Sequence, residues 1–275
     1  MAFTFYHEPN TISEASRLLI EHGKKAACLA GGTSLQHRRD GNIEHLVSLK
    51  KLELNRLEDN VIGATVTLTE LVEQESESKA MGLLQKAAGV SASDLLRNQI
   101  TVGGSALVGF RWSDLAAPLL AMDAHFELTS SEGKRSVSAS EFLDKTVPQR
   151  FLADGEILKQ IVLPNDIVRA EFTKFGMSHF CHAIWDLVVL QRNDEHIVAL
   201  SAGTPFPTRL QSVEKLLATN ELPDQGILEE AISVAIDNGQ LKISGSSGYS
   251  AEYRTSVLPA ILRDTLVRYS GGEHK

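Results

Sequence analysis

Two glycine-containing segments are the residues of this sequence best suited to chemistry. They read Ala-Gly-Gly-Thr-Ser-Leu at Ala30–Leu35 and Thr-Val-Gly-Gly-Ser at Thr101–Ser105. Paired glycines let a backbone approach a ligand closely, because no Cβ stands in the way. Consecutive main-chain N–H groups in such a turn can bind a pyrophosphate. The segments therefore predict two phosphate-binding loops, and a tight turn without a ligand is the alternative for either one alone.

The common nucleotide-binding motifs do not account for these two segments. The sequence contains no Gly-x-x-x-x-Gly-Lys-Ser/Thr, and neither segment completes Gly-x-Gly-x-x-Gly. A phosphate-binding role would therefore use a fold other than the Rossmann fold.

Other groups of potential ligands are weaker candidates. His179 and His182 flank Cys181, but this spacing is awkward for one metal ion without a fourth partner. A surface turn that leads into a strand is the alternative. The segment that starts at His7 begins like His-Glu-x-x-His but lacks the second histidine. Arg38–Arg39 is a candidate for a phosphate contact or for a solvated loop.

Predicted strands and helices place both glycine segments at the ends of regular elements. A capping box at Thr11 and Glu14 predicts a first helix. A buried strand at Ala26–Ala30 leads into the first glycine segment, and a strand at Leu46–Leu49 follows it. Ser113 is a predicted cap for the helix after the second segment. Up to a boundary at Leu163–Asn165, the other predicted strands are Val61–Val66, His125–Thr129 and Glu156–Val162. The other predicted helices are Thr69–Glu75, Met81–Gly89 and Leu115–Met122.

The last part of the chain predicts three strands followed by helices. The strands are expected near Arg169–Phe175, Ile184–Gln191 and Ile197–Ser201. The helices are expected at Thr208–Ala218, Gln225–Asn238 and Ser250–Tyr269.

Composition excludes several classes of protein. The chain has 275 residues and a net charge of −8, which argues against a nucleic-acid partner. The longest apolar runs are too short for a membrane span, and the first ten residues show no signal peptide. The two cysteines, Cys28 and Cys181, form no Cys-x-x-Cys pair, so the sequence shows no zinc framework and no all-cysteine iron–sulfur site. We expect a cytoplasmic protein.

Several segments, taken in order, resemble one known family. The first glycine segment is similar to the first FAD loop of the FAD-binding (medium) subunits of the molybdenum hydroxylase family, of the carbon monoxide dehydrogenase and xanthine dehydrogenase type. Arg97–Gly104 resembles the second FAD loop of that family. The segments that resemble its next two strands, its following helix and its terminal helix are His45–Leu49, Val61–Ala64, Ser113–Ala124 and Ser250–Arg254.

The resemblance implies an α+β fold in two parts. The first is a two-lobed FAD-binding domain of the vanillyl-alcohol oxidase/molybdenum hydroxylase flavoprotein type at 1–164, with lobe 1 at about 1–57 and lobe 2 at about 58–164. The second, at 165–275, is a small α+β domain with a three-stranded sheet and helices. FAD would bind between the two lobes.

The resemblance also implies FAD-binding residues, and no catalytic residue or metal ligand on this chain. Asp114 would accept a hydrogen bond from a sugar hydroxyl, and a helix N-terminal charge is the alternative. Lys174 would place a positive charge near the flavin, and a solvated strand lysine is the alternative. The predicted cofactor contacts are Ala30, Gly31, Gly32, Thr33, Ser34, Leu35, Thr101, Val102, Gly103, Gly104, Ser105, Asp114 and Lys174.

The sequence departs from the family pattern at three places. Ser105 stands where the family often has asparagine or aspartate, and Phe110–Trp112 replaces a stretch of small residues that contains proline. The aromatic residue that often covers the flavin aligns with Ala183 or Ile184, next to Trp185. These departures bear on the strength of FAD binding and on the electron acceptor.

Electron transfer in a heteromeric complex is the function that the resemblance implies. Electrons would pass from iron–sulfur clusters on a small subunit, after hydroxylation at a molybdenum cofactor on a large subunit, to FAD here. The acceptor would be NAD+, oxygen or a quinone. Two alternatives stay open: a self-contained FAD-dependent oxidoreductase of the same fold superfamily, and a flavin-free interaction scaffold.

Overall fold

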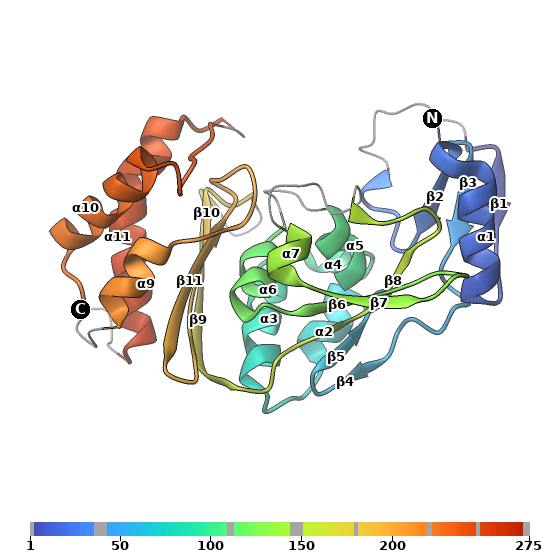
Figure 1. Cartoon of the computed structure of the whole chain (residues 1–275), viewed down its shortest axis with the longest axis horizontal. Helices are drawn as coiled ribbons and strands as arrows, with labels where there is room; N and C mark the ends of the chain where they lie inside the picture. Colours follow the sequence, from blue (N-terminus) through green and yellow to red (C-terminus); the bar gives the residue numbers. More distant parts are fainter. Residues whose placement is uncertain are drawn as a thin grey trace.

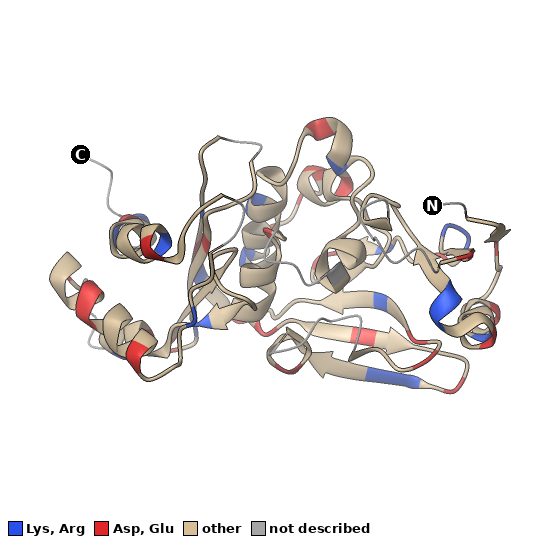
Figure 2. Cartoon of the chain, turned by 90° about the horizontal axis from the view of Figure 1, so that it is seen from above, with Lys and Arg blue, Asp and Glu red and all other residues tan. Residues whose placement is uncertain are grey.

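The protein is described here by a computed structural model that covers residues 3–35, 43–108, 113–143, 151–178, 181–218, 222–245 and 248–271. Three β-sheets follow one another along the molecule, and helices pack on them or between them (Figure 1). Acidic and basic residues are distributed over all parts of the fold (Figure 2). Within the described ranges, no helix is both long and apolar enough to cross a membrane.

The N-terminal part, which we call lobe 1, is a parallel three-stranded sheet with one long helix. Its elements are β1 (Phe5–His7), α1 (Ile12–His22), the 3-10 helix η1 (Gly23–Lys25), β2 (Ala26–Leu29) and β3 (His45–Ser48), and the strand order is β1-β3-β2. The Thr11 hydroxyl caps α1 by accepting the N–H of Glu14 at 3.1 Å. The Glu14 carboxylate accepts the N–H of Asn10 instead of completing the box at Thr11. Gly23, at φ 50°, ends the helix.

The middle part, lobe 2, is a five-stranded antiparallel sheet packed against helices. The sheet order is β4-β5-β8-β6-β7. Its elements are β4 (Leu57–Glu58), β5 (Val61–Gly63), α2 (Leu68–Glu73), α3 (Lys79–Gly89), α4 (Asp94–Arg97), α5 (Val102–Val108), α6 (Ala116–Met122), β6 (His125–Thr129), β7 (Lys134–Ser138), α7 (Ala139–Leu143) and β8 (Ile157–Val162). Every residue of α6 is buried, which explains why this helix has no polar face in the sequence.

The C-terminal part is an antiparallel sheet with three helices on one face. Its elements are β9 (Ile167–Phe175), β10 (Trp185–Arg192), β11 (Glu195–Ser201), β12 (Thr208–Arg209), α9 (Gln211–Leu217), α10 (Gln225–Asp237) and α11 (Ala251–Tyr269). The sheet order is β12-β11-β10-β9, so a fourth strand joins the three that the sequence predicts. At two residues, β12 is too short to show an alternating pattern.

Both faces of this last sheet are buried. Phe172, Val188 and Leu190 join the apolar core of lobe 2, whereas Leu187 and Val189 join a second core under α9, α10 and α11. Figure 1 shows the sheet between these helices on one side and α3 and α6 on the other. Burial on both faces accounts for the continuous apolar run of β10, which lacks the alternation of a half-exposed strand.

Gly203 supplies a test of the packing on the helical side of this sheet. A Cβ at this position would overlap the ring of Trp185, which is fully buried and donates from Nε1 to the Arg254 carbonyl at 3.0 Å. Gly203→Ala is therefore expected to lower the free energy of unfolding by about 1–3 kcal/mol, the usual range for overpacking. Urea denaturation measures this change.

The matched control is Gly82→Ala on the exposed face of α3, where an added Cβ meets nothing within 4 Å. This change should raise stability by about 1 kcal/mol, because alanine favours a helix more than glycine does. Equal effects of the two substitutions would contradict the packing described for Trp185.

Candidate functional site

The first glycine segment forms a turn with free main-chain donors at the end of β2. Gly32 has φ 76°, in the region that favours glycine, and the N–H of Leu35 closes the turn on the Gly32 carbonyl at 3.2 Å. The N–H groups of Gly31–Ser34 donate no hydrogen bond to any other described residue. Four unengaged donors in succession are what an anion-binding turn requires.

A close backbone contact joins this turn to the second predicted FAD loop. A Cβ added at Gly31 would overlap the carbonyl oxygen of Gln99, which lies just before the second glycine segment. Only a residue without a side chain fits between these two pieces of backbone. The structure therefore brings the two predicted loops together, one from each lobe.

The second glycine segment is the start of a helix. Thr101 forms an isolated bridge with Thr67, and α5 begins at the next residue. A Cβ added at Gly103 would lie 2.6 Å from the Ala64 carbonyl oxygen, so this glycine serves packing against the sheet. The interpretation of Thr101–Ser105 as a turn is therefore wrong from Val102 onward.

The main-chain donors of this second segment are already used within the protein. The four N–H groups of 102–105 donate to the carbonyl groups of Val66, Ala64 and Thr101 and to the Thr101 hydroxyl, at 2.8–3.1 Å. The side chain of Ser105 lies 2.8 Å from that of Ser113, oxygen to oxygen. A ligand contact at this segment would therefore use hydroxyl groups rather than main-chain N–H groups.

Asp114 and Lys174, which the sequence predicts separately, form one buried ion pair. Lys174 Nζ on β9 lies 3.1 Å from Asp114 Oδ2, and the two side chains are 9% and 7% exposed. Lys174 also donates to the Val90 carbonyl at 2.9 Å, and the Ser91 hydroxyl donates to Asp114 Oδ2 at 2.6 Å. The alternative of a solvated strand lysine is therefore wrong.

The predicted role of Ser113 as a helix cap is also wrong. The N-cap of α6 is Leu115, with no side-chain hydrogen bond, and the first turn of α6 holds no acidic residue. Asp114 therefore lies before the helix, and its carboxylate accepts hydrogen bonds from Lys174 and Ser91.

A third ionisable residue, Asp186, belongs to this group and was missed in the sequence. It is fully buried on β10, directly opposite Lys174 in the sheet, and Ser201 donates to its Oδ2 at 3.4 Å. Its Oδ1 receives no hydrogen bond from an N–H or O–H group of the described residues. A single aspartate inside an apolar strand is the signal that would have found it.

The charges of this group balance if Asp186 keeps its proton. Burial raises the pKa of Asp186 well above its ordinary value, and the negative charge of Asp114 raises it further. Burial also raises the pKa of Asp114, against the opposing effects of Lys174 and Ser91. A protonated Asp186 that donates to the Asp114 carboxylate satisfies both groups and leaves one negative and one positive charge.

The other candidates from the sequence do not form part of this site. Cys181 and His182 are exposed, and the Ser178 hydroxyl donates to Cys181 Sγ at 2.9 Å. His179, Arg38–Arg39 and Phe110–Trp112 lie outside the described residues. Ala183, Ile184 and Trp185 are all buried, and the last two belong to the core under the C-terminal helices.

Comparison with known proteins places the chain in a family. Residues 1–166, more than half of the chain, match the family described as FAD binding domain in molybdopterin dehydrogenase. The chain therefore belongs to this family. It is an FAD-binding oxidoreductase subunit, as the resemblance predicted.

The similar proteins include medium chains of carbon monoxide dehydrogenase. That of Hydrogenophaga pseudoflava is 32% identical over 167 residues, which cover 58% of each chain. That of Afipia carboxidovorans is 27% identical over 279 residues, which cover 96% of this chain and 95% of that one. A solved carbon monoxide dehydrogenase from Hydrogenophaga pseudoflava superposes with a TM-score of 0.86 at 24% identity, covering 98% of both chains. This similarity confirms the predicted fold.

The raised pKa of Asp186 predicts that the stability of the fold depends on pH. In the unfolded chain an aspartate loses its proton at about pH 3.9, whereas folded Asp186 keeps it to higher pH. In this window the folded state binds more protons, so the contribution of Asp186 to stability falls as pH rises toward its folded pKa. Asp186→Asn, which stays neutral, should flatten this dependence in urea unfolding of the flavin-free chain between about pH 5 and about pH 8.

Asp237→Asn on the exposed surface of α10 is the control, because it replaces the same carboxyl group at a position that is not buried. It should leave the pH dependence of stability unchanged. If the Asp186 variant keeps the slope of the wild type, Asp186 is ionised in the folded protein and the charge balance given above is incorrect.

Proposed function

We propose that this chain is the electron-transfer subunit of a heteromeric molybdenum-containing hydroxylase or dehydrogenase. It would receive electrons from iron–sulfur clusters on a small subunit and pass them to NAD+, oxygen or a quinone. Substrate oxidation would take place at a molybdenum cofactor on a large subunit. The family membership and the medium-chain relatives support this assignment. The observation that carries it is the row of unengaged N–H groups at Gly31–Ser34.

These donors fit the FAD pyrophosphate. A pyrophosphate carries negative charge close to the backbone, so it needs convergent N–H groups and no intervening Cβ. Gly31–Ser34 offers four consecutive unengaged N–H groups, two of them on glycines, and its neighbours Ala30 and Leu35 complete the turn. On the other side of the contact at Gln99, we assign cofactor contacts to the hydroxyl groups of Thr101 and Ser105. Val102–Gly104 would contact the cofactor without donating main-chain N–H groups, because those groups donate within the protein.

The ion pair between Asp114 and Lys174 would act on the sugar and flavin part of the cofactor. Asp114 would accept a hydrogen bond from a sugar hydroxyl in addition to those it accepts from Ser91 and Lys174. Because Asp114 neutralises Lys174 at 3.1 Å, the pair offers an oriented dipole and not an isolated positive charge. Asp186 would hold the carboxylate of Asp114 in this position.

The dependence on partner subunits follows from the cysteine content. An FAD molecule, when bound, can accept electrons singly and release them as a pair. An all-cysteine iron–sulfur cluster needs four thiolates, and the sequence has Cys28 and Cys181 alone. Cys28 is half-buried in lobe 1 and Cys181 is exposed. The relay that delivers electrons would therefore lie on another chain.

Sheet membership supports the predicted division of the chain. We propose lobe 1 at about 1–57, lobe 2 at about 58–164 and a C-terminal domain at 165–275, because each range contains one sheet among its described residues, apart from Leu57, the first residue of β4 in the sheet of lobe 2. We also propose that the complex is cytoplasmic.

The contact between the two loops generates a prediction about flavin binding. Gly31→Ala would force the Gln99 carbonyl away and separate the turn from the second segment. The variant should fold but retain less than about a tenth of the wild-type FAD affinity, a loss of more than about 1.4 kcal/mol of binding free energy. Flavin absorbance per chain and circular dichroism measure both properties.

Gly133→Ala is the control for this substitution, because an added Cβ there meets nothing within 4 Å. It should retain the flavin content of the wild type. A folded Gly31→Ala protein with full flavin content would exclude this turn from the cofactor site.

Isolation from the native host tests the subunit assignment. The chain should co-purify with one subunit that contains iron and another that contains molybdenum, as metal analysis of the complex would show. Alone it should do no more than reduce dyes with NADH. A single-chain protein that oxidises an organic substrate without iron or molybdenum would establish the self-contained flavoenzyme instead, and a stable chain without flavin would establish the scaffold.

A further inference from the structure

Three histidines that lie far apart in the sequence meet at one end of lobe 1. His7 is the last residue of β1, His22 the last of α1 and His45 the first of β3. One nitrogen from each ring can be chosen so that the three atoms lie within 4.8 Å of one another. All three residues are half-buried, so water reaches the group. We call His7, His22 and His45 the histidine cluster.

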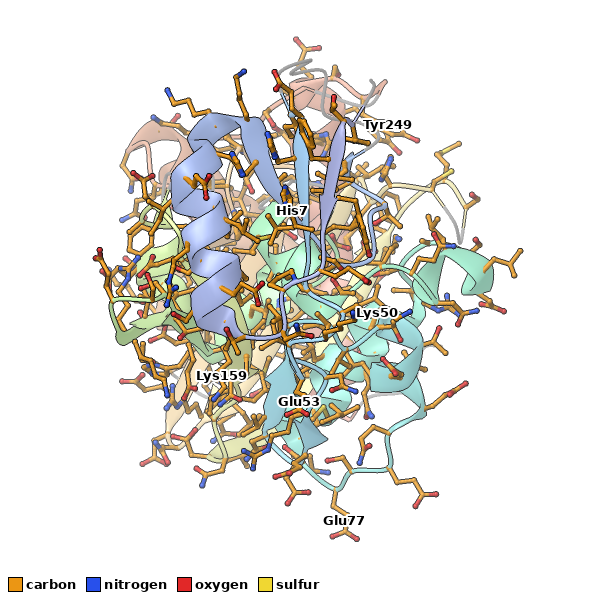
Figure 3. All side chains as sticks on the ribbon, turned by 90° about the vertical axis from the view of Figure 1, so that its right-hand side faces the viewer. His7, Lys50, Glu53, Glu77, Lys159 and Tyr249 are labelled. Atoms are coloured by element: carbon orange, nitrogen blue, oxygen red, sulfur yellow. The ribbon has the colours of Figure 1, made fainter. Side chains whose placement is uncertain are left out.

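The backbone of lobe 1 fixes the positions of these three residues. His45 pairs with Phe5 and Val47 pairs with His7 in the parallel β1–β3 ladder. Residues two apart share a face of a strand, so His45 points to the same side as Val47, which packs in the core with α1. Figure 3, in which lobe 1 faces the viewer, shows His7 on β1 beside α1.

The third member arrives at this face because α1 ends there. Gly23, at φ 50°, terminates the helix directly after His22, and the chain continues through η1 into β2. The ring of His22 consequently stacks on that of His45, with centroids 3.7 Å apart and planes 12° apart. The cluster thus contains one residue from each of three regular elements and none from a loop.

The rings of His7 and His45 are joined by a hydrogen bond between ring nitrogens. His7 Nε2 lies 3.0 Å from His45 Nδ1, a distance at which one nitrogen donates and the other accepts. Phe5 stacks on His45 with centroids 4.6 Å apart, which gives the group an apolar side. Glu44, the neighbouring carboxylate, pairs with Lys25 at 2.9 Å. Among the described residues, none of the three imidazoles forms an ion pair with a carboxylate.

We propose that the histidine cluster binds one divalent transition-metal ion of the zinc type, with water as the remaining ligand. Neutral imidazole nitrogen is a preferred ligand of Zn2+, Ni2+ and Cu2+. Nitrogens bound at about 2.0–2.1 Å in a tetrahedral shell lie about 3.3 Å apart, close to the 3.0 Å between His7 and His45. The rings now lie nearly parallel, so binding requires them to turn about their side-chain torsions, while the three backbone positions stay where they are.

The ion would clamp the end of α1 to β1 and β3, away from the predicted cofactor turn. Ala26, at the start of β2, pairs with His45, whereas Leu29, next to the glycine turn, pairs with Ser48. Because the strands are parallel, His45 lies at the end of the sheet opposite to the turn, and His7 lies on β1, which β3 separates from β2. With water completing its shell, the site would tie three elements together without contact to the flavin. This inference is independent of the proposed electron-transfer function.

Metal titration of the full, tag-free chain tests the proposal. After treatment with EDTA, the protein should bind one Zn2+ per chain in calorimetry, and Co2+ should produce visible absorption bands that Zn2+ abolishes. Loss of a group that hydrogen-bonds to a metal ligand and orients it weakens metal binding by about 10–100-fold. Loss of a ligand itself, in His7→Gln, His22→Gln or His45→Gln, should therefore weaken binding by at least about tenfold.

The control is His125→Gln on β6 of lobe 2, where the ring contacts only Ser136 among the hydrogen-bond partners that the structure shows. This variant should bind Zn2+ as the wild type does. Flavin absorbance, recorded on the same samples, separates failure of this site from failure of the cofactor site.

If a cluster variant fails to fold, an NMR titration of the wild type tests the proposal instead. The imidazole nitrogen resonances are then followed during Zn2+ addition. The proposal is overturned if the wild type shows no saturable one-to-one binding, if the cluster variants bind as tightly as His125→Gln, or if the resonances of the three rings do not shift together.

Discussion

The buried ion pair between Asp114 and Lys174 couples the construction of the fold to the region proposed for the cofactor. Asp114 comes from the segment before α6 in lobe 2, and Lys174 comes from β9 in the C-terminal sheet. Breaking a buried pair by removing one partner costs about 3–5 kcal/mol, because the other charge is left without compensation. The same interaction therefore holds the C-terminal sheet against lobe 2 and sets the direction of the Asp114 carboxylate. Burial and the charge of Asp114 raise the pKa of Asp186, which favours its neutral form and opposes the excess of negative charge that two ionised aspartates would create.

The apolar cores also join the C-terminal sheet to lobe 2, and they leave lobe 1 with a core of its own. Lobe 2 and one face of the C-terminal sheet share a single core, in which Phe172 and Val188 meet the side chains of α3 and α6. Lobe 1 has a smaller core of its own around Ala15 and Val47, with Ile157 of β8 as a contribution from lobe 2. The first glycine turn belongs to lobe 1, so its position against lobe 2 depends on local contacts. The approach of Gly31 to the Gln99 carbonyl is one of these.

The sequence predicted the elements whose patterns are local. His125–Thr129 was predicted with its observed limits, and α3, α10 and α11 were predicted within two residues. Short strands such as β1, β4 and β12 were missed because two or three residues cannot display a period. The start of α5 was mistaken for a turn, since Gly103 and Gly104 are poor helix formers and the packing against Ala64 that requires Gly103 is not visible in the sequence.

Parts of the candidate site could not be predicted either, because they depend on contacts between residues that lie far apart in the sequence. Asp114 and Lys174 were predicted from a family pattern, but their pairing spans 60 residues and no local spacing reports it. Asp186 joins them only because β9 and β10 place it opposite Lys174. The histidine cluster is a further case, in which a helix end and two strand ends bring three isolated residues together.

The two glycine segments, which look equivalent in the sequence, have different capacities to bind an anion. At 102–105 every main-chain N–H already has an acceptor within the protein, so a phosphate would have to displace a hydrogen bond to be received there. At Gly31–Ser34 the N–H groups donate to no described residue, and a phosphate oxygen adds hydrogen bonds without removing any. Breaking a buried hydrogen bond costs about 1–3 kcal/mol, so the first segment is favoured for charge recognition. Gly103 is required for packing against Ala64, and in the proposed site the first turn alone would supply main-chain donors for the pyrophosphate.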